Sequence, residues 1–139
     1  MATGRMPRVR SISMNCYVGE ASRTWNVPSK YILCTKAAQI RFPAYMFVIL
    51  DEREDSINDG WFASNPDVLY QLVDYPASYH GNAGGLSFAD GHSEIHKWID
   101  PRTRPVLRSG EALTLNVNLP GNKDVPWLAQ RAAGVSTYP

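Results

Sequence analysis

The chain has 139 residues, with 14 basic and 13 acidic side chains and a formal net charge of +1. That length suits one domain and is too short for a full doubly wound dinucleotide fold, a (β/α)8 barrel or a protein kinase. The balanced charge also argues against a nucleic-acid partner, which needs a basic patch or stripe. We therefore expect one domain over 1–139, with a flexible arm at 1–10, a head at 11–131 and a tail at 132–139.

Apolar periodicity predicts short strands in the first half of the chain. Residues 11–18 alternate apolar and polar side chains, which is typical of a strand with one buried face. After a loop at 19–29, the β-prone residues 31–35 precede a helical turn at 36–41. The longest apolar run, 44–50, predicts a central strand buried on both faces.

The second half is dominated by one hairpin. A short strand is expected at 61–63, and a strand or helical turn at 69–74. Two β-prone runs, 84–89 and 92–99, flank Asp90-Gly91, a dipeptide typical of a two-residue type I′ turn. Beyond Asp100-Pro101 we expect a late strand at 113–117 and a short helix at 125–133, with Pro126 in its first turn. The predicted class is α+β, mostly antiparallel β, with this prominent two-residue-turn hairpin and short helices.

No stretch approaches the about 20 apolar residues that a membrane-spanning helix needs. The run at 44–50 ends at Asp51, and no apolar leader follows Met1. We therefore expect no membrane insertion by this chain, and a cytoplasmic location if it is expressed as it stands.

A two-residue turn fixes which hairpin side chains share a face, because side chains alternate along each strand. The face expected to be polar carries two histidines, a carboxylate and three small residues: His92, Glu94, His96, Gly85, Ser87 and Ala89. The face expected to meet the core carries four others: Leu86, Phe88, Ser93 and Ile95. The polar face would then have room above it for a loop, a neighbour or a ligand.

The polar face has a metal-binding interpretation besides that of a solvated surface. Strand residues two apart are separated by about 6.5 Å and can reach one zinc ion, whereas His92 and His96, about 13 Å apart, cannot. Residues from elsewhere would have to complete the site. The candidate zinc ligands are His80, His92, Glu94 and His96.

The same face has a catalytic interpretation. Glu94 beside a histidine forms a base-and-orienter pair, which suits a hydrolase acting on a small glycoside or ester. A glycosidase needs a second carboxylate at about 5–9.5 Å, and Asp90 is about 11–13 Å along the strand. Asp51 or Asp55 from the acidic loop at 51–60 would have to supply it. The candidate catalytic residues are Glu94, His96, His92, Asp51 and Asp55.

The acidic loop at 51–60 also has the composition of a calcium site. It is not an EF-hand, because Ile57 stands where an oxygen ligand is needed and Pro66 where glutamate is needed. An irregular oxygen site and a solvated turn both stay open. We expect no cofactor under the main interpretation, and a divalent cation, calcium or zinc, under the alternatives.

The two cysteines, Cys16 and Cys34, leave two alternatives open. They form a disulfide in an oxidising compartment, or they pack as two small apolar side chains. The sequence does not supply the distance between them.

A longer pattern joins His80 to Asp90-Gly91 across nine residues. It is accompanied by four other segments: Ser13-Met14-Asn15, Leu50-Asp51-Glu52, the run 55–60 and the tail 124–131. From about Arg10 to Arg131, the chain resembles the prepilin-type processing-associated C-terminal domain of pseudopilin-like proteins of type II secretion. No catalytic residue follows from this resemblance.

The resemblance implies a globular head, with antiparallel β structure behind an N-terminal helix. Family members begin with a cleavable leader and a long apolar helix that anchors and polymerises them, and we expect this chain to correspond to the head alone. Its partners would be other pseudopilin or envelope proteins, including itself, in a cell-envelope or extracytoplasmic location.

The spacing of the motif also has a structural interpretation. Asp90 and Gly91 suit the positive-φ positions of a type I′ turn, and His80 is expected to hydrogen-bond that turn. The leading hypothesis is an envelope assembly or interaction module without intrinsic catalysis. The alternative is the small hydrolase described above.

Overall fold

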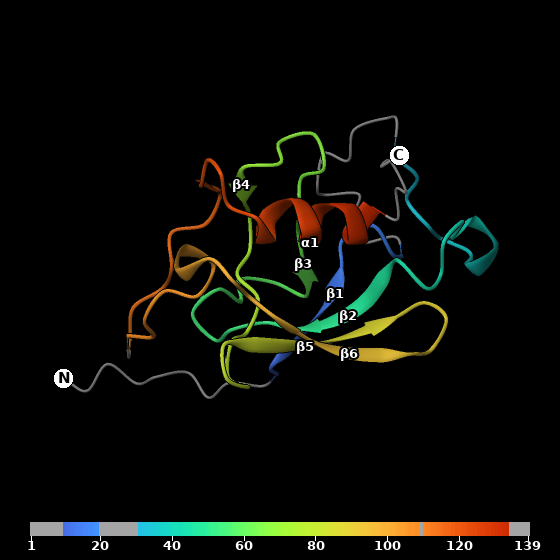
Figure 1. Cartoon of the computed structure of the whole chain (residues 1–139). Coiled ribbons are helices and arrows are strands. Elements are labelled where there is room, and N and C mark those ends of the chain that lie inside the picture. The colour runs from blue at the N-terminus through green and yellow to red at the C-terminus, as the bar shows by residue number, and fades with distance from the viewer. Residues whose placement is uncertain (1–9, 20–30, 109, 134–139) are drawn as a thin grey trace.

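Five strands form one sheet, and a C-terminal helix lies across one side of it (Figure 1). This computed structural model describes residues 10–19, 31–108 and 110–133. Most of the expected arm at 1–10 and of the expected tail at 132–139 therefore lies outside the described residues. Within them the architecture is α+β with mostly antiparallel strands, which confirms the predicted fold class.

The strands of the sheet, in spatial order, are β3 (Trp61–Phe62), β1 (Ile12–Asn15), β2 (Phe47–Asp51), β5 (Ala83–Phe88) and β6 (Ser93–Lys97). β3 runs parallel to β1, and the other neighbours are antiparallel. A separate pair consists of β4 (Gln71–Leu72) and β7 (Val117–Asn118). The described helical elements are the 3-10 turns η2 (Ala37–Gln39) and η3 (Pro101–Thr103) and the helix α1 (Asp124–Ala133). In the described part of the chain, no helix has the length and apolar character needed to cross a membrane.

Most predicted elements occur in the predicted order. β2 lies at the centre of the sheet, as its apolar sequence indicated, and α1 begins one residue before the predicted start. Two expected strands are much reduced. Residues 31–35 contribute only a bridge between Cys34 and Val18, and the strand expected at 113–117 is limited to β7, which begins at Val117.

The hairpin differs from the prediction by one residue of register. Gly85 pairs with Ile95 and Leu86 with Glu94, so that three residues, Ala89-Asp90-Gly91, separate Phe88 from its partner His92. Gly91 N–H donates to the Phe88 carbonyl at 3.0 Å, and Gly91 has a φ of +94°. This is a type I turn followed by a left-handed glycine bulge, and the predicted two-residue type I′ turn is wrong.

The one-residue difference exchanges the two faces of β6, whereas the faces of β5 are as predicted. Leu86 and Phe88 share a face with His92, Glu94 and His96, and this side, which we call the helix face, is covered by α1. The opposite side, which we call the open face, carries side chains from four strands: Ile12, Met14, Ile49, Asp51, Gly85, Ser87, Ser93, Ile95 and Lys97. Leu86 and Phe88 are therefore buried as predicted, whereas the prediction that Ser93 and Ile95 face the core is wrong, because both lie on the solvent side.

One buried amide joins the sheet to the helix. Asn15, at the end of β1, has no exposed surface. Its side-chain NH2 donates to the carbonyls of Phe47 at 2.7 Å and Ala132 at 2.8 Å, and its Oδ1 accepts the N–H of Tyr17 at 3.0 Å. The amide thereby links β1, β2 and the last turn of α1, whose carbonyls have no partner within the helix.

The first turn of α1 is held by two other side chains. Asn122 Oδ1 caps the helix by accepting the N–H groups of Asp124 at 2.8 Å and Val125 at 3.2 Å. The buried Asp124 carboxylate accepts the N–H groups of Ile99 at 3.1 Å and Asp100 at 3.0 Å, which follow β6. The helix is therefore fixed to the sheet at both ends.

Replacing Gly91 tests the observed turn. Gly91→Val should lower the melting temperature by several degrees, because a β-branched residue at this φ costs about 1–2 kcal/mol. A Cβ at this position meets no atom within 4 Å, so the cost is backbone strain alone. Thermal unfolding of Gly91→Asn is the control, since asparagine tolerates left-handed backbone and should restore much of the loss. Identical melting curves for the valine variant and the wild type would contradict the turn.

Replacing Asn15 tests the link between the layers. Asn15→Ala removes the hydrogen bonds that the buried amide makes to two carbonyls and one N–H, and it should reduce the free energy of unfolding by about 2–4 kcal/mol in denaturant titrations. The exposed Asn118 of β7 gives the control, and Asn118→Ala should cost less than about 0.5 kcal/mol. Equal effects at the two positions would contradict the linking role of Asn15.

Candidate functional site

The histidine of the long motif lies away from the Asp90-Gly91 turn. His80 N–H donates to the carbonyl of Ala83, where β5 begins, whereas the turn follows the other end of this strand. Its Nε2 lies 3.8 Å from Asp51 Oδ2, and the same oxygen accepts the N–H of Gly85 at 3.1 Å. The expected hydrogen bond from His80 to the turn is therefore wrong, and His80 instead lies beside the last residue of β2.

The turn is held together by its own aspartate and histidine. Asp90 Oδ1 lies 2.5 Å from His92 Nδ1 and accepts the His92 N–H at 3.1 Å. These two hydrogen bonds lower the pKa of Asp90 below its ordinary value. The His92 ring stacks on Phe88 with 4.4 Å between the ring centroids. This arrangement stabilises the hairpin loop and leaves both side chains exposed at its tip.

The third histidine packs between the sheet and the helix. The His96 ring stacks on Trp127 of α1 at 3.6 Å and meets the edge of Trp98 at 4.8 Å between centroids. Burial lowers the pKa of His96. The guanidinium of Arg131 lies over the Trp127 ring, 4.0 Å from its centroid. His96 is therefore part of the aromatic packing that attaches α1 to β6.

The expected catalytic and metal-binding sets do not come together. His92 and His96 contact different aromatic neighbours, while Asp55 is paired with the Arg53 guanidinium by bonds of 2.6 and 2.8 Å. Asp51 is near His80, which is a contact between two residues rather than a set of ligands. Across residues 10–19, 31–108 and 110–133, no three histidine, cysteine or acidic side chains are grouped so that they could hold a metal ion.

A buried acidic network at the end of β2 was not predicted. Glu52 has no exposed surface, although a solvated turn and an irregular oxygen site are the two alternatives that the sequence leaves open for its acidic loop. One carboxylate oxygen accepts a short hydrogen bond from the Ser13 hydroxyl, and the other accepts the Ser56 hydroxyl at 2.9 Å. The oxygen of Ser56 in turn accepts the N–H of Tyr75 at 2.8 Å. This chain of bonds joins β1, β2 and the segment after β4.

Two buried carboxyl groups in this region have strongly perturbed acidity. Burial raises the pKa of Glu52 from 4.5 to about 7, against the opposing hydrogen bond from Ser13. Burial also raises the pKa of Asp74 from 3.8 to about 7, although Asp74 accepts the N–H of Ala63 at 2.6 Å. The negative charge of Asp74 adds to the effect of burial on Glu52 and raises the pKa of Glu52 further. Both carboxyl groups accept hydrogen bonds from neighbouring hydroxyl or backbone N–H groups, so we interpret them as structural groups of the interior.

The neighbouring arginine is also internal. Arg53 is only 2% exposed, and besides its bonds to Asp55 it donates from Nη1 to the carbonyl of Pro105 at 2.7 Å. A guanidinium that bonds a carboxylate with two nitrogens is pre-organised for such a role. Arg53 and Asp55 therefore fasten the long loop after η3 to the end of the sheet.

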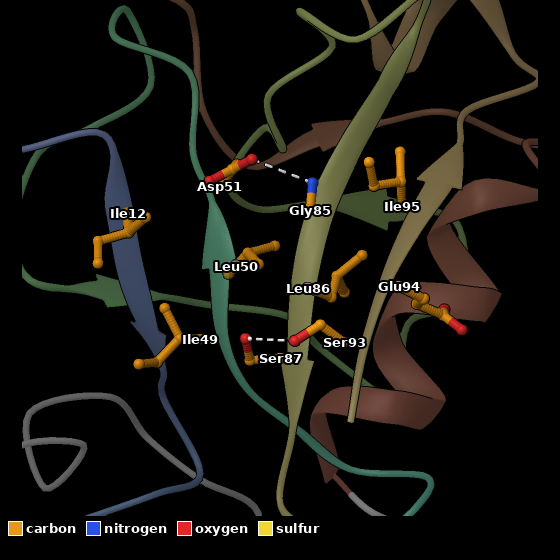
Figure 2. A pocket seen from close by; sticks show the side chains of 10 residues that line it. All are labelled: Ile12, Ile49, Leu50, Asp51, Gly85, Leu86, Ser87, Ser93, Glu94 and Ile95. Carbon is orange, nitrogen blue, oxygen red and sulfur yellow. Dashed lines mark hydrogen bonds between the residues drawn. The ribbon is translucent and has the colours of Figure 1, made fainter. Parts of the chain in front are cut away.

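The open face of the sheet has a shallow apolar hollow (Figure 2). Its volume is about 430 Å³, and its lining comes from β1, β2, β5 and β6: Ile12, Ile49, Leu50, Asp51, Gly85, Leu86, Ser87, Ser93, Glu94 and Ile95. Three isoleucines stand out, with Ile12 47%, Ile49 39% and Ile95 68% exposed. The lining includes hydroxyl and carboxylate groups but no imidazole or thiol, so its chemistry suits apolar contact better than nucleophilic catalysis.

The cysteines are both free and both buried. Burial raises the pKa of Cys16 to about 12, and it also raises the pKa of Cys34 above its ordinary value. Thiols of this kind are poor nucleophiles, because the thiolate is the reactive form. Of the two alternatives for the cysteines, the structure therefore shows two small buried side chains that are not joined by a disulfide.

Comparison with known proteins adds no assignment: no family model matches the chain, and no curated protein or solved structure is significantly similar to it.

The raised pKa values of Glu52 and Asp74 predict a pH-dependent stability. The folded protein binds protons at Glu52 and Asp74 more tightly than the unfolded chain does. Their contribution is therefore fully present below about pH 4 and is lost as the pH rises through about 7. At about 1.4 kcal/mol per pKa unit, the loss should be about 3 kcal/mol for Glu52 and about 4 kcal/mol for Asp74.

Urea titrations between pH 4 and pH 8 measure this loss as a difference between variants. The double variant Glu52→Gln/Asp74→Asn should show a flatter dependence than the wild type, whereas Glu111→Gln, at an exposed carboxylate, should match the wild type. Parallel curves for the wild type and the double variant would show that these two groups do not titrate as described.

Proposed function

We propose that this chain is a pseudopilin-like globular head that acts as an assembly or interaction module of the cell envelope, without intrinsic catalysis. The observation that carries the proposal is the open face of the sheet, where three isoleucines are partly exposed around one hollow. In the family that the sequence resembles, the head has antiparallel β structure behind an N-terminal helix. A face of this kind suits contact with an apolar helix.

The physical argument rests on the asymmetry between the two faces of the sheet. The helix face is covered by α1, and its residues Phe47, Leu50 and Leu86 are at most 2% exposed. On the open face, Ile12 and Ile49 lie on adjacent strands and remain partly exposed. Covering apolar side chains gains about 25 cal/mol for each Å² removed from water, which favours a partner with a matching apolar surface.

Three of the five candidate catalytic residues support the same proposal, because each of these three has a structural contact. His92 closes the hairpin turn, His96 packs on Trp127, and Asp55 neutralises the buried Arg53. A general base must be within hydrogen-bonding reach of a reacting group, and these residues are directed to separate internal neighbours. The hydrolase alternative has no corresponding arrangement in the described residues.

Photo-crosslinking in the source cells tests the proposal. A photoreactive amino acid in place of Ile49 should form adducts whose main partner, identified by mass spectrometry, is a pseudopilin-type protein with a long apolar N-terminal helix. The control carries the same amino acid in place of Val106, which is 81% exposed but lies in the loop after η3, away from the open face.

The charged variant Ile12→Lys should reduce the yield of the Ile49 adduct several-fold, since it places an ammonium beside the hollow. Adducts that form equally from positions 49 and 106, or a main partner without an apolar helix, would count against the proposed function. Circular dichroism and thermal unfolding of each variant show whether the head is still folded.

A further inference from the structure

The outer edge of β6 carries unpaired backbone groups. β6 is the last strand of the sheet, and Figure 1 shows it at the edge, beside β5. Phe88 N–H donates to the His92 carbonyl, and Trp98 N–H donates to the Asn82 carbonyl, both at 2.9 Å. Because bonded pairs alternate in an antiparallel ladder, even-numbered residues from 92 to 98 bond to β5. The N–H and C=O groups of Ser93, Ile95 and Lys97 therefore point outward.

This edge has few of the features that usually prevent strand pairing. Natural edge strands are kept apart by prolines, central lysines, bulges or very short length. β6 spans five residues without proline, and its central residue, Ile95, is 68% exposed. The other edge strand, β3, has only two residues. Among the described residues, no backbone group bonds to the outward positions of β6.

We propose that two copies of this chain associate through their β6 strands, paired antiparallel about a two-fold axis at Ile95. This inference goes beyond the proposed function and does not depend on it, because it concerns the edge of the sheet and not its open face. It commits to a second copy because the sequence of β6 is complementary to itself in this register.

The complementarity follows from the outward groups. With Ile95 opposite Ile95 of the second copy, Ser93 faces Lys97 of the second copy and Lys97 faces its Ser93. All outward residues then form hydrogen-bonded pairs, each with two backbone bonds. Sliding one strand by two residues in either direction leaves one outward residue of each copy unpaired.

The residues between these pairs favour the same register. Glu94 of each copy lies directly opposite His96 of the other, where side chains are closest because the pair is not hydrogen-bonded through its backbone. A carboxylate then faces a ring with an N–H donor. Sliding the strands one way instead places Glu94 opposite Glu94 of the second copy, and like charges directly opposite are destabilising.

The resulting dimer would join the two sheets into one. A two-fold axis perpendicular to the sheet keeps both α1 helices on the same side, and the two open faces become one surface with the Ile95 pair at its centre. The interaction uses identical surfaces on both copies and is closed, so it ends at the dimer. Its small area predicts a weak association.

Sedimentation equilibrium at protein concentrations from about 10 µM to about 1 mM measures this association. The weight-average mass of the wild type should rise from 15.5 kDa toward twice that value. Ile95→Lys should raise the dissociation constant at least about 10-fold, because two ammonium groups then meet at the axis. Ile12→Lys, which changes an isoleucine on the inner strand β1, should leave the dissociation constant unchanged.

A gain in affinity tests the register independently of any loss of folding. Ser93→Glu places a carboxylate opposite Lys97 of the second copy at both ends of the interface, which should tighten the dimer roughly 2- to 30-fold at low salt. The matched variant Ser93→Lys should weaken it. Equal effects of the two charges would contradict the proposed pairing.

Cysteine crosslinking tests the axis itself. Hydrogen-bonded partners have Cα atoms about 5.5 Å apart, within the range of a disulfide, so Ile95→Cys should give a covalent dimer under mild oxidation. Ser93→Cys alone should not, because its two copies are about 13 Å apart along the strands. A mixture of Ser93→Cys and Lys97→Cys proteins should crosslink.

Three results would overturn the proposal. These are a wild type that stays monomeric at the highest concentration, crosslinking of Ser93→Cys as fast as that of Ile95→Cys, and dissociation caused by Ile12→Lys but not by Ile95→Lys. The last result would place self-association on the open face. Loss of the photo-crosslinks at Ile49 with an intact dimer would instead contradict only the proposed function.

Discussion

The side-chain amide of Asn15 connects the parts of the molecule that hold its shape. Its two N–H groups reach the carbonyls of Phe47 and Ala132, which are 32 and 117 residues away in the chain. A buried amide costs free energy unless its hydrogen bonds are made, so this one is satisfied only when β1, β2 and α1 are all in place. The same helix is fixed at its first turn by Asp124, which accepts two N–H groups after β6. These two contacts determine which face of the sheet α1 covers.

Because α1 covers one face of the sheet, the ionisable groups are unevenly distributed between the interior and the open face. Ionisable groups with strongly altered environments lie inside: Glu52 and Asp74 are at most 3% exposed and held by hydrogen bonds to hydroxyl and backbone groups, and Arg53 is paired with Asp55. Perturbed acidity often marks an active site, yet structural networks produce it as well. Here neither perturbed carboxyl lines the hollow on the open face, which has three partly exposed isoleucines.

The sequence predicted the elements better than their pairing. The apolar run before Asp51 identified the central strand, and Asp90-Gly91 correctly located the hairpin. However, an aspartate and a glycine suit either a two-residue type I′ turn or a type I turn with a glycine bulge, and the local sequence does not distinguish their lengths. The difference of one residue moved Ile95 from the expected core to the solvent. The burial of Glu52 was beyond local prediction for another reason, since its partner Ser13 is 39 residues away.

That change of register also changes which functions are worth testing. With the predicted register, two imidazoles and a carboxylate would share the wet side of the hairpin, and hydrolysis would be the natural experiment. With the observed register, those groups lie on the helix face, where His96 packs on Trp127, and Ile95 takes the exposed position between Ser93 and Lys97. An exposed aliphatic side chain at the centre of a free strand is a feature of contact and not of catalysis. Both the open face and the β6 edge therefore direct experiments toward what this chain binds.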